Sequence, residues 1–215
     1  MKKLLTIIPS RWRNENHKAY AQNFFEKSRV SELLIGLDDD DAHNYERLPN
    51  VLYEVNPRLR LVGTTNLLAN KYCNEYEYLG FMGDDHRPRT DGWDELLIDS
   101  IKHLPFGIAY GNDLIKGKRL PTAVIFNSEI VRRVGYMGPP TLVHLWMDNF
   151  WLELGRALGS IVYNPNVIIE HLHYVRRKAP WDQTYVEANG FKEKDRKQWE
   201  LYMRNQFHLD VAKFK

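Results

Sequence analysis

Short apolar segments that end abruptly at polar residues, with helical segments between them, constrain the fold of this chain most. Four such segments lie in the first half of the sequence, at residues 4–8, 33–37, 51–55 and 78–82. Continuous apolar runs of this length are typical of strands covered on both faces. The residues after Asn14 and those from Gly63 to Cys73 have apolar positions at helical spacing. Because strands that alternate with helices favour a parallel sheet between helices, we predict one compact α/β domain.

The second half of the chain continues this alternation less regularly. We expect helices from Thr90 or Asp91 to about residue 104, over 128–134, and over about 145–158. Further strands are expected at 106–110, 122–126, 161–163 and 167–171. From Trp181 onward, aromatic residues are spread among charged ones, which indicates one or two helices. The predicted organisation is a catalytic-type domain over residues 1–175 and a C-terminal helical segment over 176–215 that packs on it.

Composition excludes several other classes of protein. With 215 residues, the chain has the length of one domain, and its formal net charge of +2 is too balanced for a protein whose main role is to coat nucleic acid. Cys73 is the single cysteine, so no disulfide can form within the chain. The apolar run at the start stops at Pro9, which is too short for a signal peptide, and no stretch approaches the ~20 apolar residues of a membrane span. We therefore expect a cytoplasmic protein without a membrane span.

Polar clusters follow three of the predicted strands, at residues 10–13, 38–41 and 84–86. In parallel sheets ligands bind outside the carboxyl ends of the strands, so these clusters are expected to meet in one crevice. Asp84 and Asp85 are adjacent carboxylates, which repel each other unless a cation lies between them. A divalent cation bound to a phosphate is one solution. The alternative is a solvated turn before the next helix.

The other two clusters suit a nucleotide. Asp38, the first of four consecutive aspartates, is expected to face the crevice and accept hydrogen bonds from a base or ribose, while the other three are expected to be solvated. Arg11 and Arg13 suit bidentate contact with phosphate, and Trp12 between them can pack on a base. A basic surface loop is the alternative. Arg58, Arg60 and Lys71 are weaker candidates for phosphate contacts.

Two later motifs add candidate chemistry. His171 and His173 lie two apart in an extended segment, so both imidazoles point to one side, an arrangement that suits a divalent metal. We expect one of them to bind the metal and favour His173, which lies further past the strand end. Asp148 lies among apolar residues at the start of a helix, where it either benefits from the helix dipole or faces the crevice as a general base. Glu153 is the alternative base.

The order and spacing of these motifs resemble the GT-A-fold glycosyltransferases, especially the large inverting family 2 with its many bacterial and phage-encoded members. The resemblance covers roughly residues 4–175. It rests on Ile7-Ile8-Pro9-Ser10-Arg11, Leu33-Leu34-Ile35-Gly36-Leu37-Asp38, Phe81-Met82-Gly83-Asp84-Asp85-His86, Met147-Asp148-Asn149-Phe150, and His171 or His173. The third segment resembles the Asp-x-Asp metal motif, although its first position is Gly83. That departure leaves Asp85 as the surest metal ligand.

The resemblance implies a GT-A-like domain with a mostly parallel sheet and a Rossmann-like nucleotide-binding half. The implied donor is a nucleotide diphosphate sugar, uridine-linked, and the acceptor is a hydroxyl on a glycan, a protein or a modified nucleobase. Mn²⁺ or Mg²⁺ would be held by Asp85 with His173 or His171, and Asp148 would be the base of an inverting transfer. Contacts with the nucleotide sugar are assigned to Pro9, Ser10, Arg11, Arg13, Asp38, Asn66, Lys71 and Asp84. The aromatic-rich segment after Tyr174 would border the acceptor site.

Two other functions fit parts of the pattern. A nucleotidyltransferase shares the α/β sheet and the carboxylate–metal site. It would usually carry a glycine-rich phosphate loop with a lysine after the first strand, which residues 9–13 do not provide. A non-catalytic nucleotide-sugar-binding protein would keep the crevice but need no base.

Overall fold

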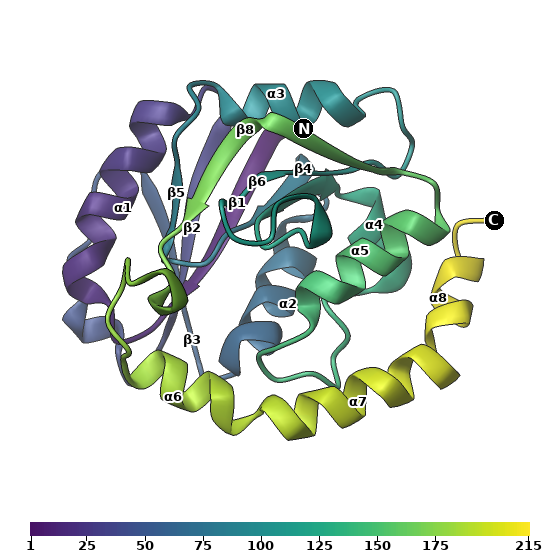
Figure 1. The fold of residues 1–215 in the computed structure, drawn as a ribbon. Helices are drawn as coiled ribbons and strands as arrows, with labels where there is room; N and C mark the ends of the chain where they lie inside the picture. Colours follow the sequence, from purple (N-terminus) through teal and green to yellow (C-terminus); the bar gives the residue numbers. More distant parts are fainter.

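The computed structural model describes residues 1–215, and its strands form one eight-stranded sheet (Figure 1). The strands are β1 (Lys2–Ser10), β2 (Ser31–Asp38), β3 (Val51–Asn56), β4 (Tyr76–Phe81), β5 (His86–Pro88), β6 (Ile108–Asn112), β7 (Val124–Asn127) and β8 (Ile161–His171). Their order in the sheet is β3-β2-β1-β4-β7-β6-β8-β5. The half from β3 to β4 is parallel throughout, whereas β7 pairs antiparallel with both neighbours and β5 pairs antiparallel with β8. The predicted α/β class is confirmed, with a mixed rather than uniformly parallel sheet.

Helices cover both faces of the sheet, which explains the unbroken apolar runs of its strands. The helices are α1 (Asn14–Lys27), α2 (Arg60–Tyr72), α3 (Trp93–Ile101), α4 (Glu129–Val134), α5 (Met147–Ala157), α6 (Gln183–Gly190), α7 (Lys192–Asn205) and α8 (Phe207–Ala212). Along β1, Leu5 and Ile7 belong to one core cluster and Leu4 and Ile8 to the other. Successive side chains of a strand point to opposite faces, so β1 contributes to both cores.

Two local expectations differ from the structure. The segments 161–163 and 167–171 form one strand, β8, whose pairing with β6 shifts register between Tyr110 and Asn112. Helix α3 begins after Gly92, which has φ +65°, and neither Thr90 nor Asp91 caps it. Both side chains have other partners, because Thr90 Oγ1 accepts from the N–H of Ile168 at 2.9 Å and Asp91 pairs with Lys27 at 2.6 Å.

The C-terminal helices α6, α7 and α8 run along one side of the domain (Figure 1). Asp195 of α7 is fully buried and accepts hydrogen bonds from the backbone N–H groups of Val143, His144 and Leu145 at 2.8–3.0 Å. Asp210 of α8 is also fully buried and accepts from the hydroxyl groups of Tyr136 and Tyr202. These carboxylates fasten the C-terminal segment to the two ends of the loop between α4 and α5. None of the helices combines the length and the apolarity that a membrane crossing requires.

Candidate active site

One pocket lies at the carboxyl ends of β1, β2 and β4, where the parallel strands end at the same edge of the sheet. Most of the predicted site residues line it: Pro9, Ser10, Arg11, Arg13, Asp38, Asp84, Asp85, Asp148, His171 and His173. The convergence expected from the strand-end clusters is therefore present. Residues of α5 and α6 complete the wall opposite the strands.

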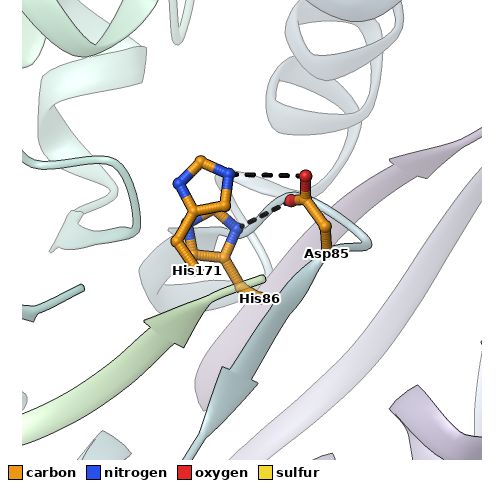
Figure 2. Close-up of side chains that lie close together, drawn as sticks. All are labelled: Asp85, His86 and His171. Atoms are coloured by element: carbon orange, nitrogen blue, oxygen red, sulfur yellow. Dashed lines mark ion pairs between the residues drawn. The ribbon is translucent and has the colours of Figure 1, made fainter. Parts of the chain in front are cut away.

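Asp85, His86 and His171 form a compact group in this pocket, shown in Figure 2. Each offers one ligand atom, and these atoms lie within 4.8 Å of one another. Oδ1 of Asp85 lies 3.3 Å from Nδ1 of His86, and Oδ2 lies 3.3 Å from Nε2 of His171. The two imidazole rings stack with their centroids 4.2 Å apart. One carboxylate between two imidazoles is a donor set that suits a divalent metal ion.

Strand pairing explains why His86 belongs to this group. The antiparallel register of β5 and β8 places His86 opposite His171. His86 has no assigned role in the sequence pattern, because its position depends on a contact between residues far apart in the chain. Its only local signal was that it directly follows Asp84 and Asp85.

His173 lies outside the group, so the geometry of the group favours His171 over His173 as the candidate ligand. β8 ends at His171, and the chain then turns, with the N–H of His173 donating to the carbonyl of His171 at 2.9 Å. Nδ1 of His173 accepts from the N–H of Val175 at 3.3 Å. The alternation of side chains along a strand therefore ends at His171, and it does not direct the His173 ring toward the metal-type group.

The protonation states of the group are those that a metal site needs. Burial raises the pKa of Asp85, but its imidazole neighbours, His171 foremost, outweigh burial and hold that pKa well below its usual range. Burial, together with the nearby His171, lowers the pKa of His86. Asp85 is thus ionised and His86 neutral at pH 7, and both forms can coordinate a cation.

Asp84 faces a different set of partners. Its carboxylate accepts from the hydroxyl of Ser10 at 2.7 Å and pairs with Arg13 at 2.5 Å. Arg13 also pairs with Asp182 at 2.9 Å and lies 3.6 Å from Asp85. Asp84 therefore anchors the arginine in the pocket wall and lies outside the metal-type group.

The pocket lining at the ends of β1 and β2 includes Arg11, Trp12 and Asp38. Arg11 donates to Asp38 at 2.8 Å and binds Asp40 with two further bonds, and its guanidinium lies 4.3 Å from the centroid of the Trp12 ring. Trp12 has φ +59° and is 39% exposed. The guanidinium of Arg58 also lies over this ring, 5.2 Å from its centroid. Strained backbone of this kind at a pocket is typical of a ligand site.

The aspartates after Asp38 differ from the expectation of three solvated side chains. Asp41 is buried and accepts from the backbone N–H of Trp12 at 2.7 Å. Asp41 therefore helps to hold Trp12 in its left-handed conformation, while Asp40 is occupied by Arg11.

Helix α6 belongs to the segment after Tyr174 that was expected to border the site, and it supplies both Tyr185 and Glu187 to the pocket lining. Glu187 pairs with both Arg58 and Arg60, and these three side chains line the pocket. Tyr185 donates to Oδ2 of Asp85 at 2.9 Å. The sequence did not predict the hydrogen bond from Tyr185 to Asp85 or the ion pairs of Glu187.

Asp148 is the second residue of α5 and lines the pocket. Its Oδ1 accepts from the N–H of Asn149 at 2.9 Å, and burial raises its pKa above the usual carboxyl value. Glu153 does not line the pocket and pairs instead with Arg156 at 2.8 Å. Asp148 is therefore the better placed of the two candidate bases.

Two predicted residues lie away from the pocket lining. Asn66 uses its side-chain oxygen to accept from the N–H groups of Met137 and Gly138 at 2.8 and 2.9 Å, so its amide fixes a loop. Lys71 pairs with Glu54 at 2.6 Å on the protein surface. Both point from α2 in directions that the helical spacing alone did not determine, and neither lines the pocket.

Comparison with known proteins supports the fold assignment. No family profile matches the chain, and no curated protein resembles it in sequence. Among solved structures, it is similar to the mannosyltransferase PcManGT of Pyrobaculum calidifontis, solved with GDP-Man and Mn²⁺. The TM-score is 0.59 at 10% identity, over 98% of this chain and 72% of that one.

Two further structures have the same fold. TarS of S. aureus gives a TM-score of 0.58 at 10% identity, over 78% of this chain and 36% of TarS, so this chain spans about a third of it. A nucleotide-diphospho-sugar transferase of Desulfovibrio desulfuricans, whose assignment is itself putative, gives 0.54 at 12% identity, over 92% and 98% of the two chains. The chain thus has the GT-A-like fold found in nucleotide-sugar glycosyltransferases, as the sequence resemblance implied.

Proposed function

We propose that this protein is a metal-dependent glycosyltransferase that transfers a sugar from a nucleotide diphosphate sugar to an acceptor hydroxyl. The observation that carries the proposal is the Asp85–His86–His171 group at the strand ends, next to a pocket lined by arginines. A mannosyltransferase of the same fold was solved with a nucleotide sugar and Mn²⁺, which supports the same ligand classes here.

The residues fit a divalent cation. An ionised carboxylate faces one nitrogen of each of two stacked imidazole rings, and the Asp85 side chain is 13% exposed, so an ion there would keep contact with the pocket. Mg²⁺ prefers oxygen ligands throughout, so nitrogen donors favour Mn²⁺. When bound, the ion would offset negative charge that develops on the departing nucleoside diphosphate.

The protein's own residues account for donor binding. Arg13, Arg58 and Arg60 line the pocket and can bind the diphosphate oxygens in bidentate geometry once their present partners give way. Trp12 lines the pocket and can stack on the base once Arg11 or Arg58 moves off its ring, and Asp38 presents a carboxylate for a base or ribose donor. We propose uridine as the base, since one carboxylate matches the single N–H donor of uracil.

Asp148 is proposed as the general base. Its carboxylate lies on α5, across the pocket from the ends of β1 and β2. In that place it can accept the proton of the acceptor hydroxyl as the oxygen attacks the anomeric carbon. Attack opposite the departing diphosphate is a single displacement, which inverts the anomeric configuration.

Calorimetric titration with UDP-sugars and GDP-sugars, each with Mn²⁺ and with EDTA, tests the proposal. We expect a UDP-sugar to bind with Mn²⁺ and to bind much more weakly with EDTA. Equal affinity in both conditions would contradict the metal bridge, and binding of GDP-sugars alone would replace uridine with guanosine. Slow Mn²⁺-dependent hydrolysis of the bound donor separates an enzyme from a protein that only binds nucleotide sugars.

A further inference from the structure

Position 83 cannot supply the carboxylate that the Asp-x-Asp pattern places there. A Cβ atom on Gly83 would lie 2.7 Å from Oδ1 of Asp85 and 3.0 Å from Nδ1 of His86, closer than side-chain atoms normally approach. The space that a side chain at 83 would need is already taken by the Asp85 carboxylate and the His86 ring. The glycine allows these two groups to approach each other.

The His86 ring is held at both nitrogens. The ring is buried, with Nδ1 accepting from the N–H of Gly83 at 3.1 Å and Nε2 lying 3.4 Å from Oγ1 of Thr122. Nδ1 is also the atom that faces Oδ1 of Asp85 at 3.3 Å. Which nitrogen carries the hydrogen therefore decides whether His86 can be a ligand.

Asp113 determines the direction of the hydrogen bonds that link it through Thr122 to His86. It is buried, and its Oδ1 accepts from the backbone N–H groups of Ile115, Lys116 and Gly117 at 2.6–2.9 Å. Its Oδ2 lies 2.9 Å from Oγ1 of Thr122. A carboxylate that accepts this many hydrogen bonds stays ionised, so Thr122 must be the donor to it.

The hydroxyl oxygen of Thr122 is then left as an acceptor for the hydrogen on Nε2 of His86. Nδ1 carries no hydrogen, and its lone pair lies beside a carboxylate oxygen that is also an acceptor. Two acceptors at 3.3 Å repel each other unless a cation interacts with both. The arrangement is the one in which second-sphere hydrogen bonds fix a histidine tautomer for metal binding.

We propose that His86 binds the metal ion through Nδ1, in place of the carboxylate that position 83 lacks, and that Thr122 and Asp113 are positioning residues that fix its tautomer. The inference rests on the metal-dependent function proposed above and extends it to these three residues. Metal binding would exchange the Gly83 hydrogen bond for a coordinate bond to the same lone pair.

Mn²⁺ binding to the full chain without nucleotide tests this, with Thr122→Val and Thr122→Ser as a matched pair. The valine removes the hydroxyl and keeps a similar shape, so we expect the Kd for Mn²⁺ to rise about 10- to 100-fold, the usual effect of losing second-sphere support. The serine keeps the hydroxyl and is expected to bind like the wild type. Unchanged melting temperatures would show that neither variant disturbs the fold.

The outcomes separate this inference from the proposed function. If the wild type binds Mn²⁺ and Thr122→Val binds it equally well, the positioning role is wrong while the proposed function stands. If the wild type does not bind Mn²⁺, both fail. The ¹⁵N resonances of the His86 ring in the metal-free wild type give an independent test, because hydrogen on Nδ1 instead of Nε2 would overturn the inference whatever the variants do.

Discussion

The hydroxyl of Tyr185 donates a hydrogen bond to Oδ2 of Asp85 at 2.9 Å, across 100 positions of the sequence. The same carboxylate oxygen lies 3.3 Å from Nε2 of His171. Burial and the charge of Asp85 raise the pKa of Tyr185, so the phenol keeps its hydrogen and remains a donor. Helix α6 thereby orients the carboxylate that we propose as a metal ligand.

Tyr185→Phe is expected to weaken Mn²⁺ binding about 10- to 100-fold, because the carboxylate loses the partner that orients it. Calorimetric titration with Mn²⁺ measures this directly. Tyr174→Phe is the matched control, since Tyr174 packs against Tyr185 with ring centroids 4.8 Å apart but its hydroxyl makes no hydrogen bond. A Tyr185→Phe variant that binds Mn²⁺ no more weakly than Tyr174→Phe would contradict the role of the Tyr185 hydroxyl.

Asp148→Asn is expected to keep the affinity for the donor and to lower turnover by ~10²–10⁴, the range for loss of a general base. The amide has nearly the same shape but cannot take a proton at pH 7. Transfer to an acceptor, or donor hydrolysis when no acceptor is known, measures turnover. Glu153→Gln is the control on the same helix, because Glu153 does not line the pocket. Wild-type turnover in Asp148→Asn would show that Asp148 is not the general base and only stabilises the start of α5.

Turnover is expected to fall in acid at a higher pH than an ordinary carboxyl would give. Burial raises the pKa of Asp148, and the base works only when it is deprotonated. Activity should therefore rise with pH through a midpoint above about 3.9, the usual value for aspartate. The pH profile of kcat at saturating Mn²⁺ tests this, since saturation removes the effect of protonated metal ligands. A midpoint at or below the usual value would contradict the assignment.

Asp195→Asn is expected to lower the free energy of unfolding by about 3 kcal/mol or more. The carboxylate is fully buried and accepts from three backbone N–H groups, and hydrogen bonds to charged groups contribute ~1.5–3 kcal/mol each. The amide leaves at least one of these donors facing its own NH₂ group. Urea denaturation measures the change. Asp99→Asn, whose side chain is 61% exposed and pairs only with Lys102, should change stability by about 0.5 kcal/mol or less. Similar losses of stability in both variants would contradict the prediction that the hydrogen bonds of Asp195 stabilise the fold.

Asp210 is expected to make the protein sensitive to acid. Burial raises its pKa, but hydrogen bonds from Tyr136, Lys213, Tyr202 and Gln206 outweigh burial and hold the pKa below its usual value. The folded state therefore binds this proton less readily than the unfolded chain does. The resulting stability is fully present above about pH 4 and is lost as the pH falls through the depressed pKa.

Urea denaturation of the wild type and of Asp210→Asn, between pH 3 and pH 6, checks this. The variant should be less stable at pH 6, and the difference should shrink as the pH drops below about 4. A difference that stays constant over the range would show that Asp210 acts through packing and not through its charge.

The sequence determined the site where position follows from a strand end. Asp38, Asp85 and the arginines after β1 lie in the pocket because each ends or follows a strand, and parallel neighbours end at one edge. Asp148 could be placed because an isolated carboxylate among apolar residues at a helix start has few other roles. These inferences need only the local pattern and the general geometry of α/β sheets.

The errors all depend on information that local patterns do not contain. The position of His86 in the site depends on the pairing of β5 with β8, which places residues 86 and 171 opposite each other. His173 lies outside the metal-type group because the chain turns after His171. Asn66 pointed toward a loop because the orientation of α2 about its axis is set by packing. Glu187 was not named in advance, because its ion pairs with Arg58 and Arg60 join residues far apart in the chain.

The hydrogen bonds between Asp195 and the residues before α5 affect the order in which the active site forms during synthesis. Asp195 lies 52 positions after Val143, so a ribosome adding about 5–20 residues per second releases it roughly 3–10 s later. During that interval the nascent chain already carries the strand ends proposed to bind the donor, but the end of the loop next to Asp148 lacks the three hydrogen bonds that Asp195 accepts. A product cut short before α7 would therefore hold a nucleotide sugar more readily than it could transfer one.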